Sequence, residues 1–123
     1  ADAQRHAAVA AIREEFARIA ARRQVELDFT PLWEARTAPC APALQAQFAA
    51  AIEAEGVPVR YLPSGAGHDG MALVGIAPIG MLFVRCEGGI SHNPAEAITV
   101  ADAAAGLRVL ARFILAFTAP ARA

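Results

Sequence analysis

Cysteine, long apolar runs and an excess of charge of one sign are all scarce in this sequence, and each scarcity excludes a class of protein. The cysteines, Cys40 and Cys86, form no CxxC pair, so the sequence indicates neither a disulfide framework nor a structural zinc site. No apolar run approaches the roughly 20 residues of a membrane span, and no basic-then-apolar segment marks a secretion signal. Lys and Arg, 11 in all, nearly balance the 12 Asp and Glu. We therefore expect a cytoplasmic protein whose partners are neither nucleic acids nor membranes.

The chain that remains after these exclusions is one ordinary domain at most. It has 123 residues, of which 56% are hydrophobic, and this length allows a single core. The first residue is Ala1 and not Met, and a helical pattern begins at once. From this start we expect a fragment of a longer protein.

The first third of the chain predicts a helix and then a strand. Over residues 3–22, apolar side chains recur at three- and four-residue spacing, which is typical of an amphipathic helix; they are Val9, Ile12, Phe16 and Ile19. Asp2 can cap the first turn, and His6 is interpreted as a surface residue. Residues 25–30 alternate apolar with polar side chains, as a strand with one wet face does, and Pro31 ends the pattern.

Two further helices are predicted by their end signals. Pro42 opens a helix at the position that proline tolerates, and Gly56 ends it. Thr99 and Asp102 resemble a capping box at the start of a long last helix. Gly106 within that helix indicates close packing against the sheet.

The predicted fold class is α/β, with part of a mixed sheet covered by helices. Residues 57–62 and 79–84 are the predicted strands, and the second is apolar on both faces, as a central strand is. Between them, Pro78 limits residues 71–77 to about two helical turns. We expect the strands near Val59 and Leu82 to lie parallel and side by side.

Two histidines follow the predicted strands in glycine-flanked loops. His68 and His92 occupy the kind of loop in which a scaffold presents side chains for chemistry, and an imidazole there can bind a metal or move a proton. The alternative is that each histidine only satisfies loop backbone. No HxxxH, HxH or DxH pair is present, so a metal site would need ligands from elsewhere.

A second interpretation of the same loop is dinucleotide binding. Gly65, Gly67 and Gly70 spell GxGxxG after a predicted strand, and acidic Glu87 follows the next one. Such a site needs a longer crossover helix than Pro78 permits. A lone glycine fingerprint is a weak signal, so this hypothesis ranks below the histidine one.

The two loops carry a resemblance to a known family. The string SGAGHDGMALVGIAPIGMLFVRCEGGISHNPAE and the helix predicted after it resemble the C-terminal part of the hydantoinase/carbamoylase amidases. That family contains allantoate amidohydrolases, N-carbamoyl-L-amino-acid hydrolases and β-ureidopropionases, within the M20 group of metallopeptidase-like hydrolases. Both histidine motifs match at the spacing of the family. Gly70, where the family usually has Ala, and Arg85, where it usually has Pro, depart from the pattern outside the two histidines.

The resemblance implies a division into two parts. Residues 1–36 resemble the last helix and strand of a lid domain, and residues 37–123 resemble the C-terminal part of an M20-type catalytic domain. Because the lid of this family makes the dimer contact, the resemblance implies a homodimer through the lid domain.

The resemblance also implies metal-dependent cleavage of a carbamoyl or ureido C–N bond in a small ureido or carbamoyl acid. Two divalent ions of zinc, manganese, cobalt or nickel per active site serve this chemistry in the family. His92 matches a metal ligand, and His68 matches a catalytic residue that contacts the substrate. The backbone of Gly65, Ala66 and Gly67 matches the place where the substrate is held, together with His68. The other ligands of the family have no counterpart here, so we expect the chain alone to be inactive.

A hypothesis from another class is a small non-catalytic binding or association module. A lid helix and strand on their own would expose an unpaired edge and an apolar face, and such surfaces associate. The oligomeric state in solution discriminates between the two hypotheses.

Overall fold

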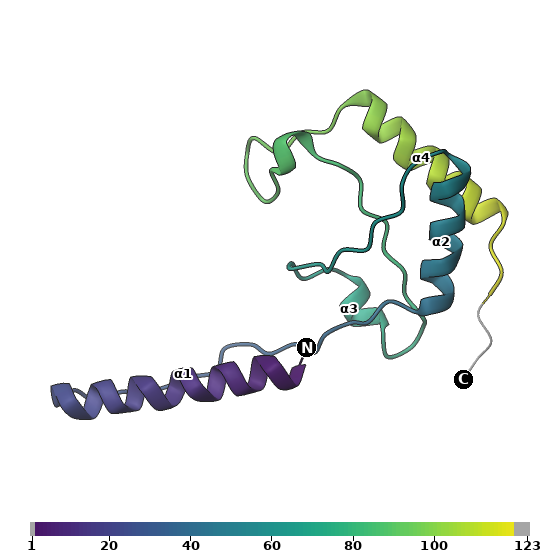
Figure 1. Ribbon diagram of the computed structural model, residues 1–123. Coiled ribbons are helices and arrows are strands. Elements are labelled where there is room, and N and C mark those ends of the chain that lie inside the picture. Colours follow the sequence, from purple (N-terminus) through teal and green to yellow (C-terminus); the bar gives the residue numbers. More distant parts are fainter. Residues whose placement is uncertain (1, 120–123) are drawn as a thin grey trace. The chain divides into compact units, whose positions relative to one another are not determined.

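The computed structural model describes residues 2–119 and divides the chain into two compact units, Ala1–Ala38 and Pro39–Ala123 (Figure 1). In chain order the elements are helices α1 (Asp2–Arg23), α2 (Pro42–Ala54) and α3 (Gly70–Leu73), the 3-10 turn η1 (Glu87–Gly89) and helix α4 (Val100–Leu115). None of the helices over residues 2–119 is long and apolar enough to cross a membrane.

The predicted mixed sheet is wrong. No strand forms anywhere in residues 2–119, and residues 57–62 and 79–84 run as coil (Figure 1). A strand exists only where its backbone N–H and C=O groups form a ladder with a neighbour. The only hydrogen bond from residues 79–84 to the backbone elsewhere is the one that the carbonyl of Ile79 accepts from the amide of Ala41, at 2.7 Å, within the part of the chain described. Residues 79–84 therefore have the apolar pattern of a strand, but no neighbouring strand within residues 2–119 pairs with them.

In the first unit, α1 lies beside the chain that follows it. The ring of Phe16 meets that of Phe29 edge-on, with centroids 6.1 Å apart, and the guanidinium of Arg13 stands 5.5 Å from the Phe29 centroid. Residues 25–30, predicted as a strand, remain coil. The physical reason is that their neighbour is a helix, whose backbone groups are already bonded internally.

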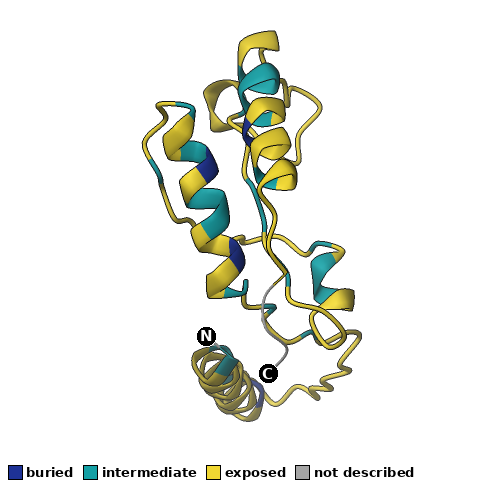
Figure 2. Ribbon diagram, turned by 90° about the vertical axis from the view of Figure 1, so that its right-hand side faces the viewer, coloured by how far each residue is buried: buried dark blue, intermediate teal, exposed yellow. Residues whose placement is uncertain are grey.

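In the second unit, α2 and α4 pack against each other. The rings of Phe48 and Phe113 stack with centroids 3.9 Å apart. Leu44 of α2 and Val109 of α4 are buried, and Figure 2 shows buried positions on both helices. Both predicted ends of α2 are confirmed: Pro42 stands in the first turn, and Gly56 has a left-handed φ of 70°. Left-handed backbone costs little only in glycine, so the helix stops there.

Residues 79–84 pass along both long helices of this unit. A Cβ on Gly80 would lie 3.1 Å from Leu44 on α2, and a Cβ on Gly106 of α4 would lie 2.9 Å from Cγ2 of Val84. The prediction that Gly106 marks close packing is thus confirmed, although the neighbour is coil and not a sheet. The segment is only partly covered, because Phe83 and Val84 remain 50% and 42% exposed.

The start of α4 has the predicted cap. The amide of Asp102 donates to Oγ1 of Thr99 at 3.0 Å, and that hydroxyl donates to the Asp102 carboxylate at 2.7 Å. Arg85 also donates to this carboxylate, through Nε at 2.9 Å. These three residues therefore fasten the loop that carries His92 to the first turn of α4.

Candidate functional site

His68 lies at the point where its loop turns into α3. Its carbonyl accepts from the amide of Met71 at 2.9 Å, and its side chain is half-buried. The imidazole folds over Gly70, since a Cβ at that position would lie only 2.9 Å from Nδ1. Asp69 occupies the cap position of α3, but its side chain makes no capping hydrogen bond. The His68 ring is thus placed by packing against Gly70.

The turn before His68 is open. Oγ of Ser64 donates to the carbonyl of Ala66 at 3.0 Å and forms a tight turn. A Cβ on Gly65 would meet nothing within 4 Å, and one on Gly67 would meet only the sulfur of Met71, at 3.7 Å. The backbone of these glycines is therefore accessible from outside the unit.

The same loop does not form a dinucleotide site. α3 contains 4 residues, Gly70–Leu73, and no strand precedes it in the described chain. A pyrophosphate site of that type needs the N-terminus of a full crossover helix behind a strand. The order of Gly65, Gly67 and Gly70 in the sequence therefore has no matching structure.

His92 occupies a left-handed backbone conformation in an exposed loop. Its φ is 56°, which is uncommon for a residue other than glycine, although His, Asn and Asp are enriched there. Its amide donates to the carboxylate of Glu96 at 2.8 Å. Its ring nitrogen Nδ1 shares a hydrogen bond of 2.8 Å with the hydroxyl of Ser91. Sequence reasoning missed both partners, although the ISHNPAE string contains them.

The structure gives each histidine a site of its own and does not assemble a metal centre. No group of three His, Cys, Asp or Glu side chains in residues 2–119 could hold a metal ion. Neither His68 nor His92 lines the two apolar grooves found beside α4, of about 480 and 420 Å³. The chain can thus supply one imidazole ligand at His92 and one polar group at His68, but not a complete coordination shell.

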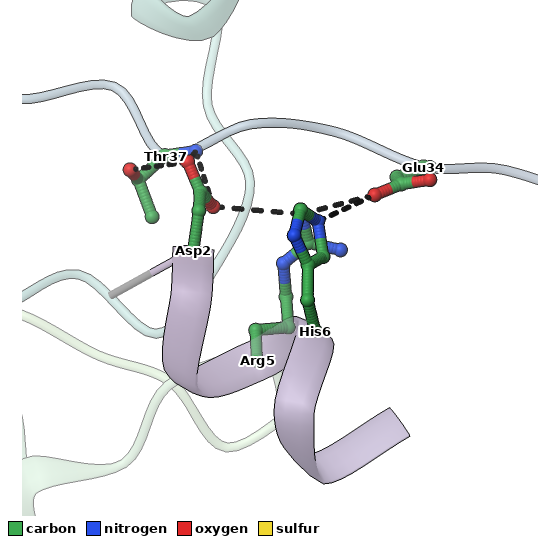
Figure 3. Close-up of polar contacts among 5 residues, drawn as sticks. All are labelled: Asp2, Arg5, His6, Glu34 and Thr37. Carbon is green, nitrogen blue, oxygen red and sulfur yellow. Dashed lines mark hydrogen bonds and ion pairs between the residues drawn. The ribbon is translucent and has the colours of Figure 1, made fainter. Parts of the chain in front are cut away.

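The third histidine belongs to a polar cluster of the first unit (Figure 3). Nε2 of His6 and Nη2 of Arg5 lie 3.0 and 3.1 Å from the same carboxylate oxygen of Glu34. Asp2 accepts from the amide and hydroxyl of Thr37 at 3.2 and 3.1 Å. The carboxylate of Asp2 therefore faces the loop. Within residues 2–119 it accepts from Thr37 and from no backbone amide of α1, so the prediction that Asp2 caps the first turn is wrong. His6, as expected, is a surface residue.

Hydrogen bonds lower the pKa of both carboxyl groups in this cluster. The bond with His6, and then that from Arg5, holds the pKa of Glu34 below its usual value. Partial burial pushes the pKa of Asp2 upward, but the hydrogen bonds from Thr37 and the charge of Arg5 outweigh this effect. The cluster therefore fastens the start of α1 to residues 34–37, which is a structural task.

Nearly the whole chain matches a known protein family. The model of the Peptidase family M20/M25/M40 matches residues 4–116, which include both histidine loops. The chain is similar to an N-carbamoyl-L-amino acid amidohydrolase of Geobacillus stearothermophilus, with 44% identity over 92 residues, or 75% of this chain and 22% of that protein. An allantoate deiminase of Arabidopsis thaliana is 58% identical over 53 residues, 42% of this chain and 10% of the relative.

A bacterial relative with a related name is also similar. The allantoate amidohydrolase of Escherichia coli (strain K12) is 42% identical over 59 residues, which cover 48% of this chain and 14% of that protein. The chain thus spans less than a quarter of the length of each of these relatives. The resemblance expected from the two histidine motifs is confirmed by a match over residues 4–116, and the chain belongs to the Peptidase family M20/M25/M40.

Proposed function

We propose that this chain forms part of the active site of a metal-dependent amidohydrolase that cleaves a carbamoyl or ureido C–N bond. The observation that carries the proposal is the family match over residues 4–116, which spans the loops of His68 and His92. Relatives named as amidohydrolases and deiminases support the reaction class, with substrates of the N-carbamoyl amino acid or allantoate type.

His92 is the residue of the chain that fits a metal ligand. Its side chain is exposed, and the contact of Nδ1 with the Ser91 hydroxyl leaves Nε2 as the nitrogen without a hydrogen bond among residues 2–119. Ligating histidines are commonly oriented in this way, through a hydrogen bond at their other nitrogen. Two divalent ions of zinc, manganese, cobalt or nickel would supply an acidic bound water and polarise the carbonyl. The other ligands have to come from outside residues 2–119.

His68 is suited to hold the substrate beside the reacting bond. Its half-buried imidazole can donate an N–H to the oxygen on which negative charge develops. The open backbone of Gly65, Ala66 and Gly67 can approach a substrate closely, because no neighbouring atom would meet a Cβ on either glycine at less than 3.7 Å. His68 is therefore the proposed catalytic residue, with the turn before it as the substrate contact.

The test uses a hybrid enzyme in which this chain replaces the matching segment of the Geobacillus relative. His92→Ala should lower metal content and activity together, since a lost ligand opens the coordination shell. His68→Ala should keep the metal and lower kcat and kcat/KM alike, by roughly 10²- to 10³-fold, the cost of a lost oxyanion donor. His6→Ala is the matched control and should change neither quantity, because His6 belongs to the polar cluster of the first unit.

Element analysis of the purified hybrids, paired with their kinetics, decides these roles. Loss of metal on changing His68, or full retention of metal on changing His92, would overturn the assignment. The chain on its own should release no ammonia from allantoate or N-carbamoyl amino acids, because it lacks the remaining ligands.

Association through the first unit is the second candidate function. Apolar side chains of α1 remain exposed, at 41% for Val9, 53% for Ile12 and 50% for Phe16. Such a surface favours self-association, and we propose residues 1–36 as the lid-domain part of a homodimer and residues 37–123 as the catalytic part. The division into compact units between Ala38 and Pro39 supports a boundary near this point. A stable monomer in size-exclusion chromatography with light scattering would count against the dimer.

A further inference from the structure

The loop of His92 is closed at its base and fastened again at its tip. At the base, the amide of Glu87 donates to the carbonyl of Ala97 at 2.8 Å. Nearer the tip, the amide of Glu96 donates to the carbonyl of Asn93 at 2.8 Å, and the Asn93 side chain accepts from the amide of Ala95 at 2.9 Å. The segment after His92 is thus folded into a tight turn that returns the Glu96 side chain toward it.

The returning Glu96 side chain meets a residue with an unfavourable backbone conformation. The Glu96 carboxylate accepts from the amide of His92 at 2.8 Å, where φ is 56°. Backbone in this region persists in a residue with a side chain only when its surroundings hold it there. A carboxylate is the stronger acceptor for such a bond, since charge-assisted hydrogen bonds exceed neutral ones.

The backbone conformation decides where the ring lies. Glu96 holds the backbone amide of His92, and the hydroxyl of Ser91 contacts Nδ1 of its ring. The residue is therefore held at its backbone and at its side chain. Nε2 is then the ring nitrogen left for a ligand. Release of the amide would let φ return to the common negative range and would turn the ring away from this position.

We propose that Glu96 is a positioning residue, which holds His92 in its left-handed conformation so that Nε2 is presented to the metal site. This inference rests on the proposed function of His92 as a metal ligand. The contact of Glu96 is with the backbone amide of His92, so the role that we assign to it acts through the histidine.

The direct test is amide hydrogen exchange by NMR on the full chain. Glu96→Ala should speed exchange of the His92 amide by about tenfold or more, because a hydrogen bond to a charged acceptor is lost. Glu96→Gln keeps an acceptor oxygen and should speed it by roughly threefold or less. Glu87→Ala is the matched control in the same loop, since only the backbone of Glu87 takes part in its closure, and it should leave the His92 amide unchanged.

Exchange in α2 and α4 shows whether a variant remains folded. Unchanged exchange of the His92 amide in Glu96→Ala would overturn the proposal, and so would equal acceleration by Glu87→Ala. If the amides of α2 and α4 also exchange faster in Glu96→Ala, that variant is partly unfolded and Glu96→Gln becomes the test. Acceleration of the His92 amide in Glu96→Gln as large as in Glu96→Ala would then overturn the proposal.

Metal content of the hybrid enzyme separates this inference from the proposed function. Glu96→Ala should lower metal content less than His92→Ala does, and Glu96→Gln should restore most of it. Retention of full metal by Glu96→Ala, while His92→Ala loses it, overturns the positioning role alone. Full retention of metal by His92→Ala overturns the role of His92 as a ligand instead. Hydrogen exchange on the chain then still tests the contact between Glu96 and the His92 amide.

Discussion

Gly70 is the single residue whose missing side chain most affects the candidate site. The His68 ring and the Cδ1 atom of Ile79 lie 2.9 and 3.2 Å from where a Cβ on Gly70 would be. Real Cβ atoms have no neighbours as close as the first of these distances, so a side chain there requires the ring to move. The position of the His68 imidazole thus depends on a glycine two residues away.

Gly70→Ala should displace the ring of His68 from its place over α3. Alanine favours a helix over glycine by about 1 kcal/mol, but this gain requires the imidazole to rotate outward. The expected result is a change in the NMR chemical shifts of the His68 ring nuclei with α3 retained. Gly67→Ala is the control, because its Cβ would meet only the Met71 sulfur at an ordinary 3.7 Å. Equal changes in both variants would contradict this explanation.

Among the elements, α4 is tied most closely to its neighbours. Phe113 stacks on Phe48 of α2, Gly106 meets Val84, and Arg108 and Arg112 both donate to the carboxylate of Glu55, the Arg108 bond being 2.8 Å long. The contacts fall on successive turns of one helix. Packing of α2 on α4 is therefore supported by aromatic, steric and charged contacts together.

Gly106→Ala should destabilise the chain despite the better helix propensity of alanine. The added methyl would lie 2.9 Å from Cγ2 of Val84, and β-branched Val84 has few rotamers in which to move away. Overpacking typically costs about 1–3 kcal/mol, which exceeds the gain of about 1 kcal/mol in propensity. The measurement is the free energy of unfolding in urea.

A double variant separates the clash from other effects of the same substitution. Val84→Ala removes the methyl groups that Gly106→Ala would meet, so the pair should be more stable than the sum of the single changes predicts. Simple additivity of the two changes would show that Val84 is not the obstacle.

Glu55 should make the packing of α2 on α4 sensitive to acid. The hydrogen bond from Arg112, and then that from Arg108, holds the pKa of Glu55 below its ordinary value of 4.5. A carboxyl whose pKa is lower in the folded state contributes stability above the unfolded value, and this contribution disappears as pH falls through the folded value. The free energy of unfolding should therefore decrease as pH falls below about 4.5.

Glu55→Gln should reduce that dependence on pH, since the amide cannot titrate. Urea titrations at neutral pH and at roughly pH 3 measure the effect, at pH values on both sides of the ordinary carboxyl pKa. Glu53→Gln removes an exposed carboxylate from the last turn of α2, two residues before Glu55, that forms no ion pair within residues 2–119. It controls for the loss of one charge. A pH dependence in Glu55→Gln equal to that of the unchanged chain would refute the assignment.

At the scale of the whole molecule, little of the chain is buried. Over residues 2–119 the buried positions are Ala20, Leu44, Ala51 and Val109, and most other apolar side chains are half-buried or exposed (Figure 2). One of these four lies in the first unit and three lie in the second. Each unit is thus stabilised by few contacts, in keeping with the small share of its relatives that the chain spans.

The chain alone should bind divalent metal only weakly. No group of three His, Cys, Asp or Glu side chains over residues 2–119 could hold an ion, so one imidazole would leave most of the coordination to water. Calorimetric titration with zinc should detect no tight site, and His92→Ala should remove any weak one. A submicromolar dissociation constant would mean that subunits share ligands or that other residues take part.

The sequence alone was sufficient for features that depend on neighbours along the chain. The helix signals at Pro42, Gly56 and Thr99 act within a few residues, and each is confirmed. The two histidine motifs were sufficient to identify the family, because the types and spacing of their residues are specific. Ser91 and Glu96 were visible in the same string, but their contacts with His92 follow from a turn that the pattern did not reveal.

Only the tertiary structure decided whether the strand patterns became strands. The apolar side chains of residues 79–84 are equally compatible with a sheet and with a coil between two helices, and a ladder requires backbone from another segment. In this chain the segment packs against Leu44 through Gly80 and against Gly106 through Val84, and no strand lies beside it within residues 2–119. Helices form from bonds inside one segment, whereas a strand depends on a partner that its own sequence does not specify.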